Sequence, residues 1–120
     1  MAALLLVAHG SRRVSSNNEI RILAEKVREH DAGRRYEDVR CAFLELAEPS
    51  IPDGIEECIQ AGASSVKVLP YFLSAGRHVI EDIPREVEGK QREHPEVRIE
   101  LVPYLGLAES MPELLLAMAG

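Results

Sequence analysis

The chain has 120 residues, of which 46% are hydrophobic and 28% are charged, and its formal net charge is −6. These values are typical of one globular domain, here residues 1–120, with an ordinary core, and they exclude a disordered or fibrous chain. The negative charge and the few aromatic side chains argue against nucleic acid as a partner, because nucleic acid requires a basic face.

Two apolar runs, residues 2–8 and 114–119, are the longest in the chain. Both are far shorter than the ~20 residues that a membrane span needs. The first lacks the basic start and the cleavage site of a secretory signal. We therefore expect a cytoplasmic protein with no membrane partner, in which Cys41 and Cys58 stay reduced in the core.

The first half of the chain predicts two strand–helix pairs. Residues 3–8 form the short continuous apolar run of a buried strand. Apolar residues at helical spacing follow from residue 20 to residue 27. Residues 39–46 predict a second strand, after which Ser50 caps a helix that should end near Gly62.

The second half repeats this order. Residues 65–70 predict a third strand, and a long connection over residues 71–81 leads to a helix that opens at Asp82. Residues 97–101 alternate in the pattern of an edge strand, and a last helix begins at residues 110–113. Strict alternation predicts an α/β fold, a three-layer αβα sandwich with a four-stranded parallel sheet.

In such open sheets a ligand binds beyond the carboxyl ends of the strands. Three segments lie there: one begins with His9, one contains Glu45, and one ends with His78. Two imidazoles and a carboxylate suit a divalent ion such as Co²⁺, Ni²⁺ or Fe²⁺, and they also suit proton transfer near neutral pH. The other histidines, His30 and His94, lie near predicted helix ends among charges and are expected to be solvated or to cap helices.

Polar and basic residues surround these candidates. Ser11, Arg12 and Arg13 follow His9, and Arg77 precedes His78. Guanidinium groups match carboxylates geometrically, so these residues are candidates for binding an anionic substrate. The sequence has no phosphate-binding G-x-x-x-x-G-K-[ST] loop, no dinucleotide-binding G-x-G-x-x-G turn and no G-x-S-x-G nucleophile elbow.

Three segments together resemble the sirohydrochlorin chelatases of the CbiX type. They are residues 8–11 (AHGS), residues 43–52 (FLELAEPSIP) and residues 69–84 (LPYFLSAGRHVIEDIP). The resemblance covers essentially the whole chain and implies a short, single-domain form of this ATP-independent family, with the chelatase-type, flavodoxin-like half domain. It further implies a homodimer whose two halves face each other.

The resemblance also implies a reaction and a set of roles. Members insert Co²⁺, Fe²⁺ or Ni²⁺ into sirohydrochlorin, so the metal is a substrate and no permanent cofactor is expected. The family's metal-site histidines match His9 and His78, and its acidic residue matches Glu45, although Glu48 is close enough to leave that choice open. Cobalt insertion for cobalamin is the first expectation, and insertion of iron for siroheme or of nickel are the alternatives.

Two other functions compete with this interpretation. A histidine phosphatase would also place a histidine after its first strand, but that class has Arg-His-Gly where this chain has Ala8-His9-Gly10. A carrier that binds the metal or the tetrapyrrole without turnover is a second alternative, which the sequence leaves open.

Overall fold

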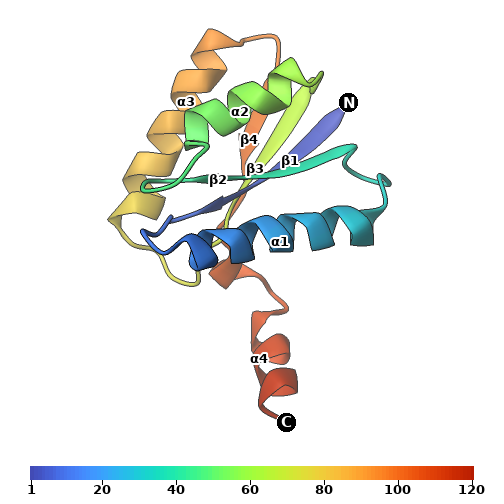
Figure 1. Ribbon diagram of the computed structural model, residues 1–120, viewed down its shortest axis with the longest axis vertical. Helices are drawn as coiled ribbons and strands as arrows, with labels where there is room; N and C mark the ends of the chain where they lie inside the picture. Colours follow the sequence, from blue (N-terminus) through green and yellow to red (C-terminus); the bar gives the residue numbers. More distant parts are fainter.

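The computed structural model describes the backbone of residues 1–120 and every side chain except that of His78. Strands and helices alternate along the chain (Figure 1). The strands are β1 (Ala2–Ala8), β2 (Asp38–Phe43), β3 (Ser65–Pro70) and β4 (Arg98–Leu101). The α-helices are α1 (Val14–Asp31), α2 (Ile51–Gln60), α3 (Ile83–Glu93) and α4 (Met111–Ala119), with a π-helical turn at His78–Asp82 and a 3₁₀ turn at Leu105–Leu107.

All four strands are parallel and lie in the order β2-β1-β3-β4. Their carboxyl ends therefore meet at one edge, which we call the carboxyl edge. The chain leaves β1 toward β2 on one side and then returns to β3 on the other side of β1, so the topological switch point lies between β1 and β3. This confirms the predicted four-stranded parallel sheet.

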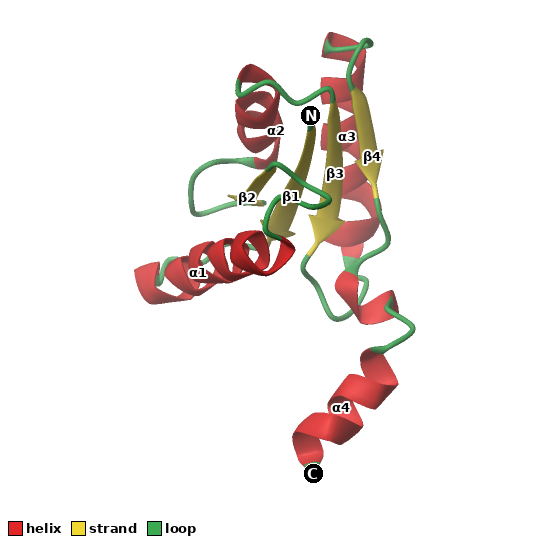
Figure 2. Cartoon of the chain, turned by 90° about the vertical axis from the view of Figure 1, so that its right-hand side faces the viewer, coloured by secondary structure: helices red, strands yellow, loops and turns green.

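Two layers of helices cover the sheet (Figure 2). Helices α2 and α3 pack on one face, where the larger core gathers side chains such as Leu5, Ile55 and Ile83, each fully buried. Helix α1 packs on the other face, where Ala24 joins Leu6 in a smaller core. The three-layer αβα prediction is thus confirmed, and both cysteines are free, with Cys58 in the larger core.

Local signals account for most element boundaries. Ser50 accepts a hydrogen bond from the Asp53 amide at 3.3 Å, which confirms the predicted cap of α2. Gly62, with φ of 111°, follows the end of that helix as expected. Among the described residues, no helix combines the length and the apolar character that crossing a membrane requires.

Two predicted boundaries were wrong. Strand β2 ends at Phe43 and not at residue 46, because the Phe43 amide donates to the carbonyl of Pro49 at 2.8 Å and closes a loop there. His78 does not lie in an open loop: its backbone begins the π-helical turn that runs into α3. The period of the apolar pattern did not reveal either boundary.

Candidate active site

His9 and Glu45 face each other at the carboxyl edge. Beyond the ends of β1 and β2 their loops stay joined, since the Glu45 amide donates to the His9 carbonyl at 3.0 Å. This pairing holds the two side chains together, with 3.4 Å between His9 Nε2 and Glu45 Oε1. Their side chains are 48% and 50% exposed, so the pair lies on an open edge and not in a closed pocket.

The histidine ring is oriented by its own turn. His9 Nδ1 lies 3.1 Å from the Gly10 carbonyl oxygen, which can accept the Nδ1 proton. In that tautomer the Nε2 lone pair and the Glu45 carboxylate can bind a metal ion together, whereas a protonated Nε2 pairs with Glu45 directly. A histidine whose Nδ1 proton is held by a backbone carbonyl, with Nε2 left as a ligand, is a common arrangement in metal sites.

Gly10 allows the turn after β1 to lie close to the loop that carries Glu45. Its φ is 94°, a conformation that side chains rarely adopt, and a Cβ at this position would lie 1.7 Å from the Glu45 carbonyl oxygen. The turn after β1 can therefore touch the loop after β2 only when residue 10 is glycine. The neighbouring sequence does not reveal the contact that requires this glycine.

Asn17 holds the loop that carries His9, and sequence reasoning missed it. This side chain is only 6% exposed, and it accepts from the Ser11 amide at 3.0 Å while its own amide donates to the Ser11 carbonyl at 2.8 Å. A buried amide with both ends paired fixes a loop strongly. The only sequence signal is an asparagine in the early turns of a helix, which by itself predicts nothing specific.

Arg21, also missed, braces the loop that carries Glu45. Its guanidinium lies 5.1 Å from the centre of the Phe43 ring and donates to the Glu48 carbonyl at 2.9 Å. Glu48 itself lines a separate surface cavity with neighbours that include Asp53. Of the two candidate acids, the structure therefore brings Glu45, and not Glu48, to His9.

The third predicted segment reaches the same edge from β3. The Tyr71 amide donates to the Val7 carbonyl at 2.7 Å, so this connection starts beside β1, and the Ile80 amide donates to Gly76 at 3.1 Å where the π-helical turn begins. The side chain of His78 lies outside the described part of the structure, so its predicted pairing with His9 stays a prediction. Arg77, its neighbour, is exposed.

The predicted substrate-binding residues surround this edge. Arg12 and Arg13 are exposed, like Arg77, and in the described part of the chain none of these three guanidinium groups forms an ion pair. Ser11 has a local role as well, because its hydroxyl accepts from the Arg13 amide at 3.0 Å. The arginines leave their charges available to an anion, which agrees with the predicted role without testing it.

Exposed apolar side chains form a further feature of this edge that the sequence did not reveal. They come from the segments that follow the first three strands and include Val14 (67% exposed), Leu46 (54%), Leu73 (71%) and Ile80 (64%). Large apolar groups on loops around a polar pair are unusual on a water-exposed surface and indicate a surface that binds something. A flat, partly apolar ligand with charged substituents would match both these side chains and the arginines.

Comparison with known proteins agrees with this arrangement. The CbiX family model matches residues 3–119. The chain belongs to the CbiX family. It is 44% identical over 85 residues to a sirohydrochlorin cobaltochelatase of Methanococcus maripaludis, an alignment that covers 71% of this chain and 57% of that protein. It is 34% identical over 109 residues to the sirohydrochlorin ferrochelatase of Bacillus subtilis, covering 91% of this chain and 41% of that protein.

Solved structures give the same result. A cobalamin biosynthesis CbiX protein of Marinobacter aquaeolei superposes with a TM-score of 0.74 at 32% identity, covering 99% of this chain and 92% of that one. The sirohydrochlorin chelatase SirB of Bacillus subtilis subspecies spizizenii, in complex with cobalt, superposes with a TM-score of 0.83 at 30% identity, covering 98% of this chain and 49% of that one. This CbiX chain thus spans about half the length of several relatives that it matches.

A second polar cluster of the CbiX chain lies between α2 and α3. Lys90 Nζ is 2.6 Å from both Glu56 and Glu93, and His94 Nε2 is 2.8 Å from Glu56. The hydrogen bonds from Lys90, Gln60 and His94 lower the pKa of Glu56 to about 2, and Glu56 in turn raises the pKa of His94. Because the ammonium group already lies between the carboxylates, this cluster is an ion-pair network that joins two helices.

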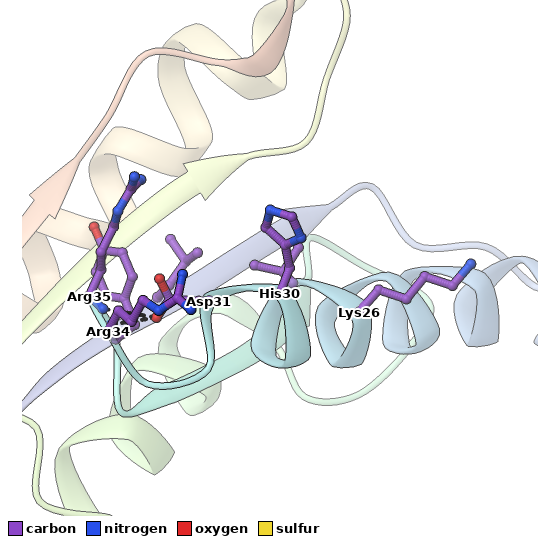
Figure 3. A pocket seen from close by; sticks show the side chains of 8 residues that line it. Lys26, His30, Asp31, Arg34 and Arg35 are labelled. Carbon is purple, nitrogen blue, oxygen red and sulfur yellow. Dashed lines mark hydrogen bonds between the residues drawn. The ribbon is translucent and has the colours of Figure 1, made fainter.

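His30 is also separate from the carboxyl edge. It lies in the last turn of α1 and lines a surface cavity of about 550 Å³ with the basic residues Lys26, Arg34 and Arg35 (Figure 3). The acid among them, Asp31, accepts backbone hydrogen bonds from Tyr36 and Arg35, which lower its pKa. As predicted, His30 and His94 lie near helix ends among charges.

Proposed function

We propose that this protein inserts a divalent metal ion, Co²⁺ first, into sirohydrochlorin without ATP. The observation that carries the proposal is the orientation of His9, whose Nδ1 is held by Gly10 while Nε2 faces Glu45 at 3.4 Å. A lone pair and a carboxylate that converge on one point at an open edge form a partial coordination site with room for a large substrate. The names of the related proteins support the choice of substrate.

In this proposal the residues at the carboxyl edge have different roles. His9 and His78 bind the incoming ion, which sheds water as it approaches the ring. A divalent ion that enters a tetrapyrrole displaces two N–H protons. Glu45 accepts one because it lies beside the ligand histidine, and the histidine that releases the ion to the ring accepts the other. No phosphate chemistry is needed, which agrees with a sequence that lacks a nucleotide-binding loop.

The substrate matches the surroundings of the pair. Sirohydrochlorin is a flat macrocycle with carboxylate side chains at its rim. Arg12, Arg13 and Arg77 would bind those carboxylates, with the Ser11 turn between them. Apolar side chains such as Leu46 and Leu73 would contact the face of the ring. The local arginines thereby overcome a net charge that is unfavourable for an acidic substrate.

Cobalt is our first choice of metal, with Fe²⁺ and Ni²⁺ as alternatives. Histidine and carboxylate ligands accept all three ions, so the site itself discriminates weakly. Relatives named as cobaltochelatases and as ferrochelatases are both similar to this chain. Competition between the metals for a limiting amount of sirohydrochlorin, followed by absorbance, measures the preference directly.

We further propose a cytoplasmic homodimer in which two carboxyl edges face each other. One half-exposed pair on an open edge cannot enclose a disc as large as a tetrapyrrole, whereas two edges related by a twofold axis form a cleft. SirB, of which this chain covers 49%, has the length of about two such units. Light scattering at working concentration should give the mass of two chains.

The decisive experiment measures turnover. Purified protein, excess sirohydrochlorin and Co²⁺ are mixed without ATP, and the metallated product is followed by absorbance for wild type, His9→Ala, His78→Ala and Glu45→Gln. We expect each variant to lose most of the catalysed rate, whereas His30→Ala, a matched change away from the edge, keeps it. Wild-type rates in both His9→Ala and His78→Ala would overturn the site assignment.

The same mixture tests the two competing functions. A non-catalytic carrier would change the spectrum only up to one equivalent of tetrapyrrole per site, whereas an enzyme converts many equivalents. A histidine phosphatase would hydrolyse a generic phosphoester at a rate that disappears in His9→Ala.

A further inference from the structure

The cavity beside the carboxyl end of α1, which we call the basic cavity, has no part in the proposed metal insertion. Its volume is about 550 Å³. Sites for organic ligands usually have volumes of ~300–1,000 Å³, whereas a single inorganic anion would fill only a small part of such a space. Leu4 of β1 lines the cavity, and four residue steps of ~3.3 Å separate it from Ala8 at the carboxyl edge. The cavity is therefore a separate surface, about 13 Å from that edge.

The floor of the basic cavity is apolar. Leu4, Val27 of α1 and the ring of Tyr36 line it. All three side chains are half-buried, and they form the outer part of the smaller core. A floor of this kind can contact the flat face of an organic molecule, but it offers nothing to a small hydrated ion.

The rim of the basic cavity carries four basic side chains, which are all exposed: Lys26, His30, Arg34 and Arg35. Figure 3 shows Lys26 at one end of the rim and the two arginines at the other. In the part of the chain that the structure describes, the charged ends of Lys26, Arg34 and Arg35 form no ion pair and no hydrogen bond. Arg28, on the same helix, instead lies 2.8 Å from Glu25. The three permanent cations of the rim are therefore available to a ligand.

Two features of the helix end offset only part of this positive charge. Asp31 lines the cavity, but its carboxylate already accepts hydrogen bonds from the amides of Arg35 at 3.0 Å and Tyr36 at 2.9 Å. The carboxyl end of a helix carries a partial negative charge that acts within its last turn, and Lys26 precedes that turn of α1. Three cations around one carboxylate, in a chain whose net charge is −6, indicate a site for an anion.

The arrangement of the cations favours several separate carboxylates over a chain of phosphates. Phosphates commonly bind where backbone amides converge at the amino end of a helix. The basic cavity lies at the carboxyl end of α1 and offers charged side chains. Lys26 and His30 are one turn apart, ~6 Å along the helix, and Arg34 follows beyond its end. Charges spread in this way match carboxylates distributed around a larger molecule.

The carboxyl edge combines the same kinds of group. There, unpaired arginines lie among exposed apolar side chains such as Leu46 and Leu73, around the His9–Glu45 pair. The basic cavity has the cations and the apolar surface without such a pair. Among the described residues, no group of three side chains that could hold a metal ion includes His30 or Asp31. The cavity is therefore suited to bind the same class of molecule without inserting a metal.

We propose that the basic cavity binds a second tetrapyrrole polycarboxylate. The flat face of the macrocycle contacts the apolar floor, and its carboxylates pair with the three permanent cations of the rim. The choice of a tetrapyrrole rests on the proposed function, whereas the need for a flat, multiply anionic ligand rests on the cavity alone. The cavity holds this molecule beside the protein and does not metallate it.

Methyl resonances of the full chain in solution test the proposal, because the ring current of a macrocycle shifts methyl groups that lie against its face. The probe is uroporphyrin, a stable tetrapyrrole with eight carboxylates. We expect it to shift the methyl resonances of Leu4 and Val27 upfield, in addition to those of Leu73 at the carboxyl edge. Amide spectra show whether each variant is folded.

Two double variants separate the cavity from net charge. Arg34→Ala/Arg35→Ala should weaken the binding reported by Leu4 and Val27 by about tenfold, because two exposed ion pairs are lost. The matched control, Arg92→Ala/Arg98→Ala, removes the same charge from exposed positions on α3 and β4 and should leave this affinity unchanged.

Three results would overturn the proposal. The first is no shift at Leu4 and Val27 at a concentration of uroporphyrin that shifts Leu73. The second is equal weakening by the two double variants, which would mean that net charge and not the cavity attracts the probe. The third is a shift of the same methyl groups by a peptide of eight glutamates but not by uroporphyrin, which would identify an acidic protein as the partner. Uroporphyrin in the cavity of a protein that inserts no metal would refute the proposed function alone.

Discussion

Gly10→Ala should damage both the fold and the site, because residue 10 joins them. The new Cβ would lie 1.7 Å from the Glu45 carbonyl oxygen and 2.9 Å from the Glu45 carbonyl carbon, at a φ of 94°. The unfavourable φ costs about 1–2 kcal/mol. Relief of the overlap by moving backbone costs about 1–3 kcal/mol more. We therefore expect the free energy of unfolding to fall by about 2–5 kcal/mol.

Three other glycines separate these contributions. Gly33→Ala has a φ of 73° with open space around it, so it should show the conformational cost alone. Gly106→Ala has the overlap, 1.9 Å from the Leu73 carbonyl, without the positive φ. Gly89→Ala has neither and lies inside α3, where alanine is preferred by about 1 kcal/mol, so it should stabilise the protein.

Urea unfolding measures the loss of stability in Gly10→Ala, and the initial rate of metal insertion measures the damage to its site. Movement of the Glu45 loop by about 1 Å should cost about 100-fold in rate, because the reacting groups lose their alignment. Gly33→Ala and Gly89→Ala should keep the wild-type rate. If Gly10→Ala matches Gly33→Ala in both stability and rate, the contact between residue 10 and Glu45 is not what orients the site.

Three further predictions concern single side chains. Asn17→Ala should lower the free energy of unfolding by about 2 kcal/mol, since Ser11 loses two hydrogen bonds, whereas Asn18→Ala, which loses one exposed hydrogen bond from Arg21, should lower it less in the same urea titration. Arg77→Ala should raise KM for the tetrapyrrole several-fold with little change in kcat, and an unchanged KM would remove Arg77 from the substrate site. His94→Gln should destabilise the protein below pH 6.5 but not well above it. Folding raises the pKa of His94, so the protonated side chain stabilises the folded state. This stabilisation is complete below the ordinary histidine pKa of 6.5 and disappears as the pH rises through the raised pKa of His94 in the folded protein. Urea midpoints on both sides of pH 6.5 that differ from wild type by the same amount would contradict this.

Most of the fold could be predicted because its signals are local. The apolar run at Ala2–Ala8 and the alternation in β4 are properties of a few adjacent residues, and Ser50 caps α2 through an amide three residues away. The boundaries that were wrong depend on hydrogen bonds in the connecting loops. Strand β2 ends at Phe43 because of a bond to Pro49, and the period of the apolar pattern does not record that bond.

The site was predictable only in part. Parallel topology predicts His9 and Glu45 at one edge, and the structure brings them to 3.4 Å. The residues that hold them there were not predictable. Asn17 and Arg21 act on backbone carbonyls and amides of other loops, and nothing in their neighbouring sequence distinguishes them from ordinary helix residues.

The sequence alone determined the order of the elements, the edge that carries the proposed site, and the choice between strand and helix for nearly every segment, because these depend on periodicity and on topology rules. Only the tertiary structure decided which carboxylate faces His9, why residue 10 must be glycine, and that α4 stands apart from the other layers with its apolar side chains exposed. Those outcomes depend on distances between residues that are far apart in the chain. Such distances exist only after the sheet has formed and its turns have closed on one another.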